Sequence, residues 1–183
     1  MTRPAVATVF LAATFFCVAC SLSLAAQTAP SKAANAEACQ LLPTGDLEKT
    51  FSGNVTHPHG IDGDSSICTV NIGALAVKLL SAPAGTADVP TSIAQGLVGA
   101  RMMLGEAKQS PRANTRDFGK VGCLRMKMSK GFDGQPLAKP LLTTSCFLVE
   151  GGYLNMSVSG ENPKRASFEV VKTLLEKAAA RRP

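Results

Sequence analysis

Apolar residues recur along this chain with two periods, one typical of strands and one of helices. Runs in which apolar and polar positions alternate predict five strands. These strands cover residues 67–72, 74–80, 119–128, 141–149 and 153–158. Helical spacing predicts three helices. They cover residues 36–51 with a break at Pro43, residues 88–104, and a final segment that follows Asn162.

The second and third helices carry start signals and apolar stripes. Asp88 before Val89-Pro90 has the pattern of an N-cap followed by a first-turn proline, and Asn162-Pro163 repeats it. The stripes consist of Ile93, Leu97, Ala100 and Leu104, and of Phe168, Val171, Leu175 and Ala178. Gly96 and Gly99 each weaken the second helix by about 1 kcal/mol relative to alanine. We therefore expect its backbone to lie close against a neighbour.

The predicted order of elements is α-β-β-α-β-β-β-α. Strands joined by short turns pair antiparallel, and helices with one apolar stripe bury that stripe on a sheet. The sequence therefore predicts an α+β fold, a two-layer sandwich with the helices on one face of the sheet.

The other face of this predicted sheet collects polar side chains. Alternation places there Lys78, Arg125, Lys127, Tyr153 and Asn155, together with Ser157. They would form a basic, hydrogen-bonding surface with one aromatic ring, which we interpret as a binding surface. The alternative is a solvated face without function, because antiparallel sheets commonly leave one face in water.

The N-terminal segment has the pattern of an export signal. Arg3 precedes an apolar run that ends in small residues, and the run is shorter than the roughly 20 residues that span a bilayer. We expect a signal peptide at residues 1–26, a flexible leader at 27–36 and a single domain at 37–183. In an alternative interpretation Cys20 follows a poor lipobox and is lipidated, which would tether the domain to a membrane.

The chain has 19 basic and 13 acidic residues, a net charge of +6. A basic exported protein is attracted to anionic components of the envelope, such as phospholipid headgroups, although the charge also serves solubility. Nucleic acid is a poor candidate partner. The chain has no Trp, one Tyr and no basic run interleaved with aromatics.

Four cysteines, Cys39, Cys68, Cys123 and Cys146, lie beyond the signal segment. An even set in an exported protein predicts two disulfides and an oxidising, periplasmic or secreted location. The stretch from Ala38 to Leu47, ACQLLPTGDL, resembles the opening of small bacterial exported proteins and lipoproteins that begin with Cys-x-Leu-Leu. Some of these families have the Mog1/PsbP-like α/β sandwich.

That resemblance implies a disulfide between Cys39 and Cys68. The faces of the predicted elements agree with this pairing, since Cys39 lies beside the helix leucines and Cys68 shares a face with Val70. Cys123 shares a face with Arg125, which places it on the open side of the sheet. Cys146 is left as its cross-strand partner.

Catalytic and metal-binding patterns are weak. His57 and His59, with Asp62 and Asp64 nearby, offer two histidine ligands, whereas structural zinc takes four ligands. Ile67 stands where a calcium loop requires glycine. The sequence has no Gly-x-Ser-x-Gly elbow. We expect neither enzymatic activity nor a cofactor.

These observations favour an exported, non-enzymatic binding domain of the cell envelope, such as an inhibitor, an immunity-type protein or an accessory subunit. Its partner would be an envelope protein or an anionic envelope component. The alternative function is a carrier that holds a small apolar or lipid ligand between the helix layer and the sheet.

Overall fold

The computed structural model describes residues 36–106, 108–130, 135–161 and 165–183. The predicted signal peptide with Cys20, nearly all of the leader, and the predicted cap Asn162-Pro163 lie outside these residues.

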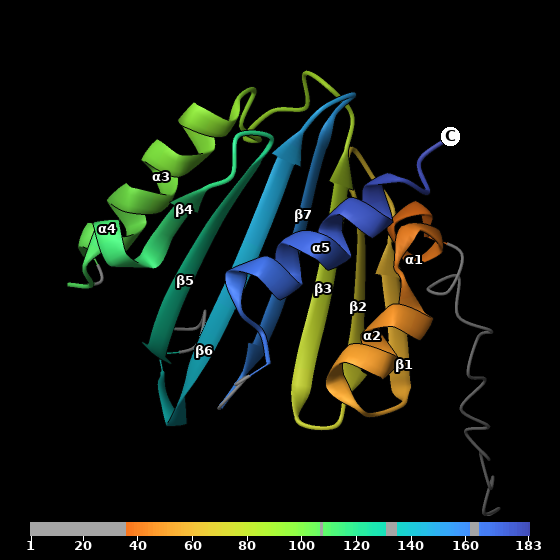
Figure 1. Ribbon diagram of the computed structural model, residues 1–183, viewed down its shortest axis with the longest axis horizontal. Helices are drawn as coiled ribbons and strands as arrows, with labels where there is room; N and C mark the ends of the chain where they lie inside the picture. The colour runs from red at the N-terminus through yellow and green to blue at the C-terminus, as the bar shows by residue number, and fades with distance from the viewer. Residues whose placement is uncertain (1–35, 107, 131–134, 162–164) are drawn as a thin grey trace, which may run out of the picture.

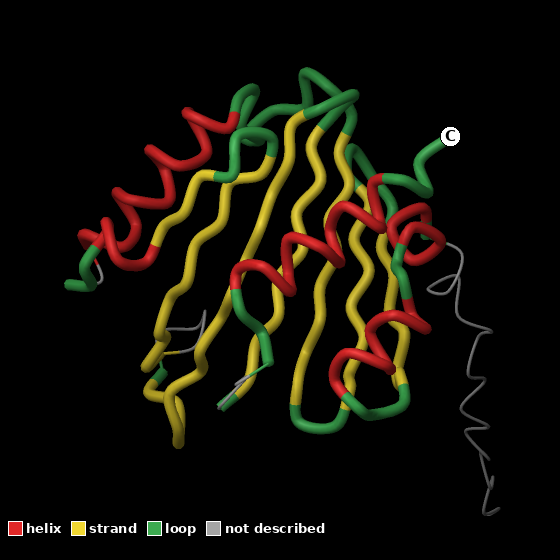
Figure 2. Tube along the Cα trace, viewed as in Figure 1, coloured by secondary structure: helices red, strands yellow, loops and turns green. Residues whose placement is uncertain are grey.

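Seven antiparallel strands form one open sheet in the described part of the chain (Figures 1 and 2). Their order is β1-β2-β3-β7-β6-β5-β4, so β3 and β7 join an N-terminal half of the sheet to a C-terminal half. The strands are β1 (Val55–Ile61), β2 (Ser66–Ile72), β3 (Leu75–Ala82), β4 (Thr115–Asp117), β5 (Val121–Lys130), β6 (Pro136–Val149) and β7 (Tyr153–Gly160).

Three helices cover one face of this sheet: α1 (Glu37–Leu41), α2 (Thr44–Phe51) and α5 (Phe168–Ala179). Figure 1 shows α5 crossing in front of the central strands, with α1 and α2 beside it. The core lies between these helices and the sheet. Its fully buried side chains include Leu47, Leu79, Met156 and Leu175. We call this side the α5 face.

The α5 helix begins at Phe168, and its cap is Ser167, whose hydroxyl accepts a hydrogen bond of 3.2 Å from the Val170 amide. The predicted stripe is confirmed, because Val171, Leu175 and Ala178 are all buried.

The α3 helix (Ile93–Glu106) packs on the opposite face, which we call the open face, at the end of the sheet formed by β4, β5 and β6. Gly96 of α3 lies against Phe147, and adjacent residues of a strand face opposite sides of the sheet. Because Cys146 belongs to the α5 core, Phe147 and α3 lie on the other face. Leu97 and Leu104 are buried on α3. The antiparallel α+β architecture is as predicted, but the helices do not all lie on one face.

The structure also has elements that the sequence pattern did not predict. The polar stretch 52–66 contains β1, and the short α4 (Pro111–Asn114) and β4 lie between α3 and β5. The expected cap Asp88 lies outside α3, with a φ of 64°. The hydroxyl of Ser92 instead accepts a 3.1 Å hydrogen bond from the Gln95 amide, so the helix begins about four residues later than predicted.

Candidate functional site

The five residues predicted to share the open face separate into two groups. Lys78, Tyr153 and Asn155 lie on the open face, where Lys78 pairs with Ser157 across β3 and β7. Arg125 and Lys127 lie on the α5 face, so the prediction is wrong for these two residues. The structure therefore does not form the predicted basic surface.

Arg125 has a structural role beneath α5. Its Nη2 donates a 2.8 Å hydrogen bond to the carbonyl of Ala166, and its guanidinium carbon lies 5.0 Å from the centroid of the Phe168 ring. Its Nε donates to the hydroxyl of Thr144. These contacts fix the segment that leads into α5. Lys127 is exposed farther along β5.

The two predicted disulfides are present. Cys39–Cys68 joins α1 to β2, and Cys123–Cys146 joins the paired strands β5 and β6. Cys123 and Cys146 are fully buried in the core of the α5 face, whereas the sequence pattern had placed them on the open face. Both bonds indicate an oxidising, extracellular compartment. Among the described helices, none is long and apolar enough to cross a membrane.

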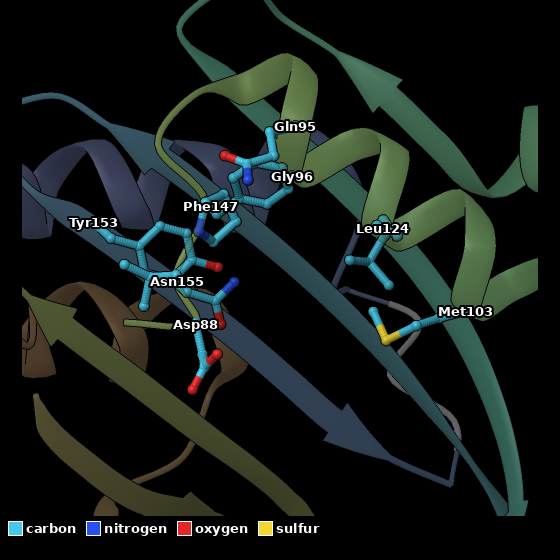
Figure 3. Close-up of a pocket in the computed structure, with 12 residues that line it drawn as sticks. Asp88, Gln95, Gly96, Met103, Leu124, Phe147, Tyr153 and Asn155 are labelled. Atoms are coloured by element: carbon cyan, nitrogen blue, oxygen red, sulfur yellow. The ribbon is translucent and has the colours of Figure 1, made fainter. Parts of the chain in front are cut away.

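The open face carries a groove of about 600 Å³ between α3 and the sheet. In Figure 3, Tyr153 and Asn155 lie beside one another, with Gln95 and Gly96 on α3 above them and Leu124 and Met103 toward the far end. We call it the α3 groove. It is lined by Asp88, Val89 and Pro90, by Gln95, Gly96, Gly99, Ala100 and Met103 of α3, and by Leu124, Phe147, Tyr153 and Asn155 of the sheet.

A second hollow of about 220 Å³ adjoins this groove. The two share the walls Val89, Pro90 and Tyr153, and the second hollow reaches Gly151 and Gly152 in the β6–β7 turn. From Gln95 to Met103 the α3 wall alone is about 12 Å long, at 1.5 Å per residue. The combined site is therefore elongated.

Phe147 forms the base of the groove and sets the position of α3. A Cβ atom built on Gly96 would lie 2.3 Å from Cε2 of the Phe147 ring, and one on Gly122 would lie 2.6 Å from its Cζ. The ring is therefore held between two backbones that have no side chain. This confirms the expected close approach for Gly96. It does not hold for Gly99, since a Cβ there meets nothing within 4 Å.

Tyr153 is the aromatic residue shared by both parts of the groove. Its ring centroid lies 6.1 Å from that of Phe147. Burial raises the pKa of Tyr153 to about 12, although a hydrogen bond with Asn155 acts in the opposite direction. The phenol therefore stays protonated at neutral pH, able to donate and accept hydrogen bonds but unsuited to act as a base.

Both floor residues are held in place by their neighbours. The side-chain amide of Asn155 donates to the hydroxyl of Ser145 at 2.8 Å and to the carbonyl of Cys146 at 3.2 Å. Arg182 Nη2 donates to the carbonyl of Tyr153 at 2.8 Å and to the hydroxyl of Ser81 at 3.1 Å. Arg182, near the C-terminus, thus fixes the start of β7. Because Asn155 is held as well, the floor of the groove is preorganised.

The rim of the groove is polar. Asp88 has the one carboxylate among the described residues that line the groove, and none of them is a lysine, arginine or histidine. The groove is therefore bordered by an acidic group, although the protein as a whole is basic. Its left-handed backbone, uncommon outside glycine but tolerated by Asp, turns the chain there. The side-chain oxygen of Gln95 accepts hydrogen bonds from the amide and the hydroxyl of Thr91 at 2.7 and 2.9 Å.

His57 and His59 lie on the edge strand β1, both exposed, with His57 at a φ of 52° in an irregular stretch of the pairing with β2. Asp62 nearby accepts a hydrogen bond from Ser66. Within residues 36–161 and 165–183, apart from the gaps at 107 and 131–134, no three His, Cys, Asp or Glu side chains come together to hold a metal ion.

Sequence reasoning identified Tyr153 and Asn155 but missed Asp88, Phe147 and the groove itself. The available signal was Gly96 in α3 together with Gly122, the two glycines that lie against Phe147. Comparison with known protein families, curated proteins and solved structures finds no match, so the interpretation of the site depends on its own geometry.

Proposed function

We propose that this protein is an exported, non-enzymatic binding domain whose α3 groove receives a segment of a partner protein in the cell envelope. The observation that carries this proposal is the α3 groove, with its buried aromatic base and polar rim. Its main part, about 600 Å³, lies within the roughly 300–1,000 Å³ range of ligand sites.

The shape of the groove favours an extended segment of polypeptide. It follows α3, and the second hollow adjoins it at Tyr153 beside the β6–β7 turn, so a long and narrow occupant fits this surface better than a compact one. Apolar side chains of such a segment would pack on Met103, which is 50% exposed, and on Val89. Its backbone groups would find a hydrogen-bond partner in the Tyr153 hydroxyl, and this combination of apolar and polar contacts is the one that peptide-binding grooves use.

The chemistry of the lining supports binding over catalysis. The phenol of Tyr153 is neutral far above physiological pH because burial raises its pKa to about 12. The other lining side chain that ionises, Asp88, is exposed at the rim. General acid–base catalysis requires a group poised near neutral pH, whereas recognition requires only fixed donors and acceptors.

A carrier of a small apolar ligand is the second candidate function. Val89, Met103, Leu124 and Phe147 give the groove apolar walls that suit an acyl chain. Its ligand would lie between α3 and the open face, on the side of the sheet away from α5. Both candidates use the same groove, so they predict occupants of different chemistry and not different sites.

Photo-crosslinking in the living host tests the proposal and separates the two candidates. We would replace the exposed groove residue Gln95 by p-benzoylphenylalanine and identify the adduct by mass spectrometry. A protein adduct supports the proposed function, and a lipid adduct supports the carrier. The absence of any adduct from Gln95, when a probe at Lys49 on α2 gives one, would refute both.

Gly99 and Gly105 supply the matched blocking variants on the same helix. Neither position has an atom within 4 Å of an added Cβ, but Gly99 lines the groove and Gly105 does not. A Gly99→Leu side chain would therefore project into the groove from an unobstructed Cβ and should abolish the Gln95 adduct. Gly105→Leu adds the same side chain outside the groove and should leave the adduct intact.

A further inference from the structure

The α3 helix presents a second surface that faces neither the sheet nor the groove. Val98 is 48% exposed and Met102 is 65% exposed, and the two are one helical turn apart on the side away from Leu97 and Leu104. Large apolar side chains are otherwise few on the described surface, where Ile61 and Met103 complete the set. We call Val98 and Met102 the α3 ridge.

Cations lie toward the C-terminal end of this ridge. Arg101 lies within α3, Lys108 follows it and Arg112 belongs to α4, which packs on α3. Glu106 is the one carboxylate among the described residues from 93 to 114. Lys127 does not add to these cations, because only its backbone contacts Gln109 and its side chain lies on the α5 face. Glu106 lies one turn beyond Met102 on the same side of α3. The ridge is therefore apolar, with more cations than carboxylates near its C-terminal end.

We propose that the α3 ridge docks the protein onto the surface of an anionic lipid bilayer. The apolar side chains would enter the boundary between headgroups and acyl chains, and the flanking cations would bind lipid phosphates. A convex ridge needs no matching hollow in a fluid bilayer. This surface is distinct from the α3 groove, so the proposal does not depend on the proposed function.

A second copy of the chain is a weaker occupant of the ridge. A stable protein interface buries roughly 800 Å² on each partner. Two large exposed apolar side chains provide much less than that, and the excess of cations beside them disfavours the association of two copies. An anionic bilayer instead satisfies the apolar and the cationic groups together.

Vesicle co-sedimentation of the purified, disulfide-bonded protein tests this inference. We expect binding to vesicles that contain phosphatidylcholine and phosphatidylglycerol, weak binding to phosphatidylcholine alone, and release by salt. The double variant Val98→Gln/Met102→Gln should weaken binding about tenfold or more through lost apolar insertion. Lys108→Gln/Arg112→Gln should weaken it by about tenfold as well, since each cation near the surface contributes.

Two control variants make the same chemical changes elsewhere. Ile61→Gln removes an exposed apolar side chain from β1, and Lys49→Gln/Lys78→Gln removes two cations from α2 and β3. Both should leave vesicle binding unchanged. All of these positions are exposed, and far-ultraviolet circular dichroism checks that each variant is folded.

Three results would overturn the inference. The first is equal binding to neutral and anionic vesicles, and the second is a Val98→Gln/Met102→Gln variant that binds as well as the parent protein. The third is a dimer in lipid-free sedimentation velocity that this double variant dissociates, because the ridge would then be an interface between copies.

Discussion

Replacing Gly96 with alanine isolates the contact that holds α3 against the open face. Alanine improves helix propensity by about 1 kcal/mol at an interior position. At Gly96, however, the new methyl group would lie 2.3 Å from Cε2 and 2.5 Å from Cζ of Phe147. Overpacking of this kind costs about 1–3 kcal/mol. The Phe147 ring cannot move away easily, because the backbone of Gly122 lies on its other side.

Gly99→Ala is the matched control, since it gains the same helix propensity at a position where an added Cβ meets nothing within 4 Å. The helix contribution cancels between the two variants, so their difference in free energy of unfolding measures the contact with Phe147. We expect Gly99→Ala to be about 1 kcal/mol more stable than the parent. Gly96→Ala should be less stable than Gly99→Ala by about 2 kcal/mol.

Equilibrium urea unfolding followed by circular dichroism measures these differences. Combining Gly96→Ala with Phe147→Leu removes the ring atoms that clash, so the double variant should be no less stable than Phe147→Leu alone. If Gly96→Ala is as stable as Gly99→Ala, α3 does not lie against Phe147, and the geometry of the groove is refuted.

Three further predictions concern the groove, the disulfides and the α5 cap. Tyr153, the only tyrosine, should give a single tyrosinate absorbance titration near pH 12 in the folded protein and near about pH 10 in urea. Because the pKa of Tyr153 is raised, the folded state favours the neutral phenol. The contribution of this shift to the free energy of unfolding is complete below about pH 10 and is lost as the pH rises toward 12. A titration of the folded protein near pH 10 would contradict the burial of Tyr153. Replacing Cys123 and Cys146 by alanine should lower the free energy of unfolding by about 3.5 kcal/mol in the chain-entropy model, measured by urea unfolding, and an unchanged midpoint would contradict it. Ser167→Ala should cost about 1 kcal/mol in the same assay through loss of the bond from Val170, and Ser167→Asp should restore it.

Much of the fold was readable from the sequence because most strands and helices have one clearly apolar side. The α5 stripe and the alternation of β2 and β7 predicted their buried faces correctly. The Cys39–Cys68 pairing, implied by resemblance and by sidedness, is present, as is Cys123–Cys146. The resemblance to Mog1/PsbP-like domains and the lipidation of Cys20 stay predictions.

The assignment of β5 failed for a physical reason. At this end the sheet has helices on both sides, so Cys123 is buried beneath α5 while its neighbour Leu124 lines the groove beside α3. Neither face of such a strand is distinctly polar. Met126 is apolar but lies on the open face, and Arg125 is charged but lies on the α5 face. Arg125 lies beneath α5 because Ala166 and Thr144 supply acceptors, which a pattern of hydrophobic positions does not reveal.

The glycines of α3 connect the packing of this helix with its proposed function. Gly96 is required by packing, because Phe147 occupies the space of its side chain. Gly105 lies in the last turn of the helix and outside the groove. Gly99 lies mid-helix and is not required by packing: it costs about 1 kcal/mol relative to alanine, and nothing lies close to an added Cβ. A side chain added at Gly99 would narrow the α3 groove. We therefore infer that this position is glycine because the groove has to hold an occupant.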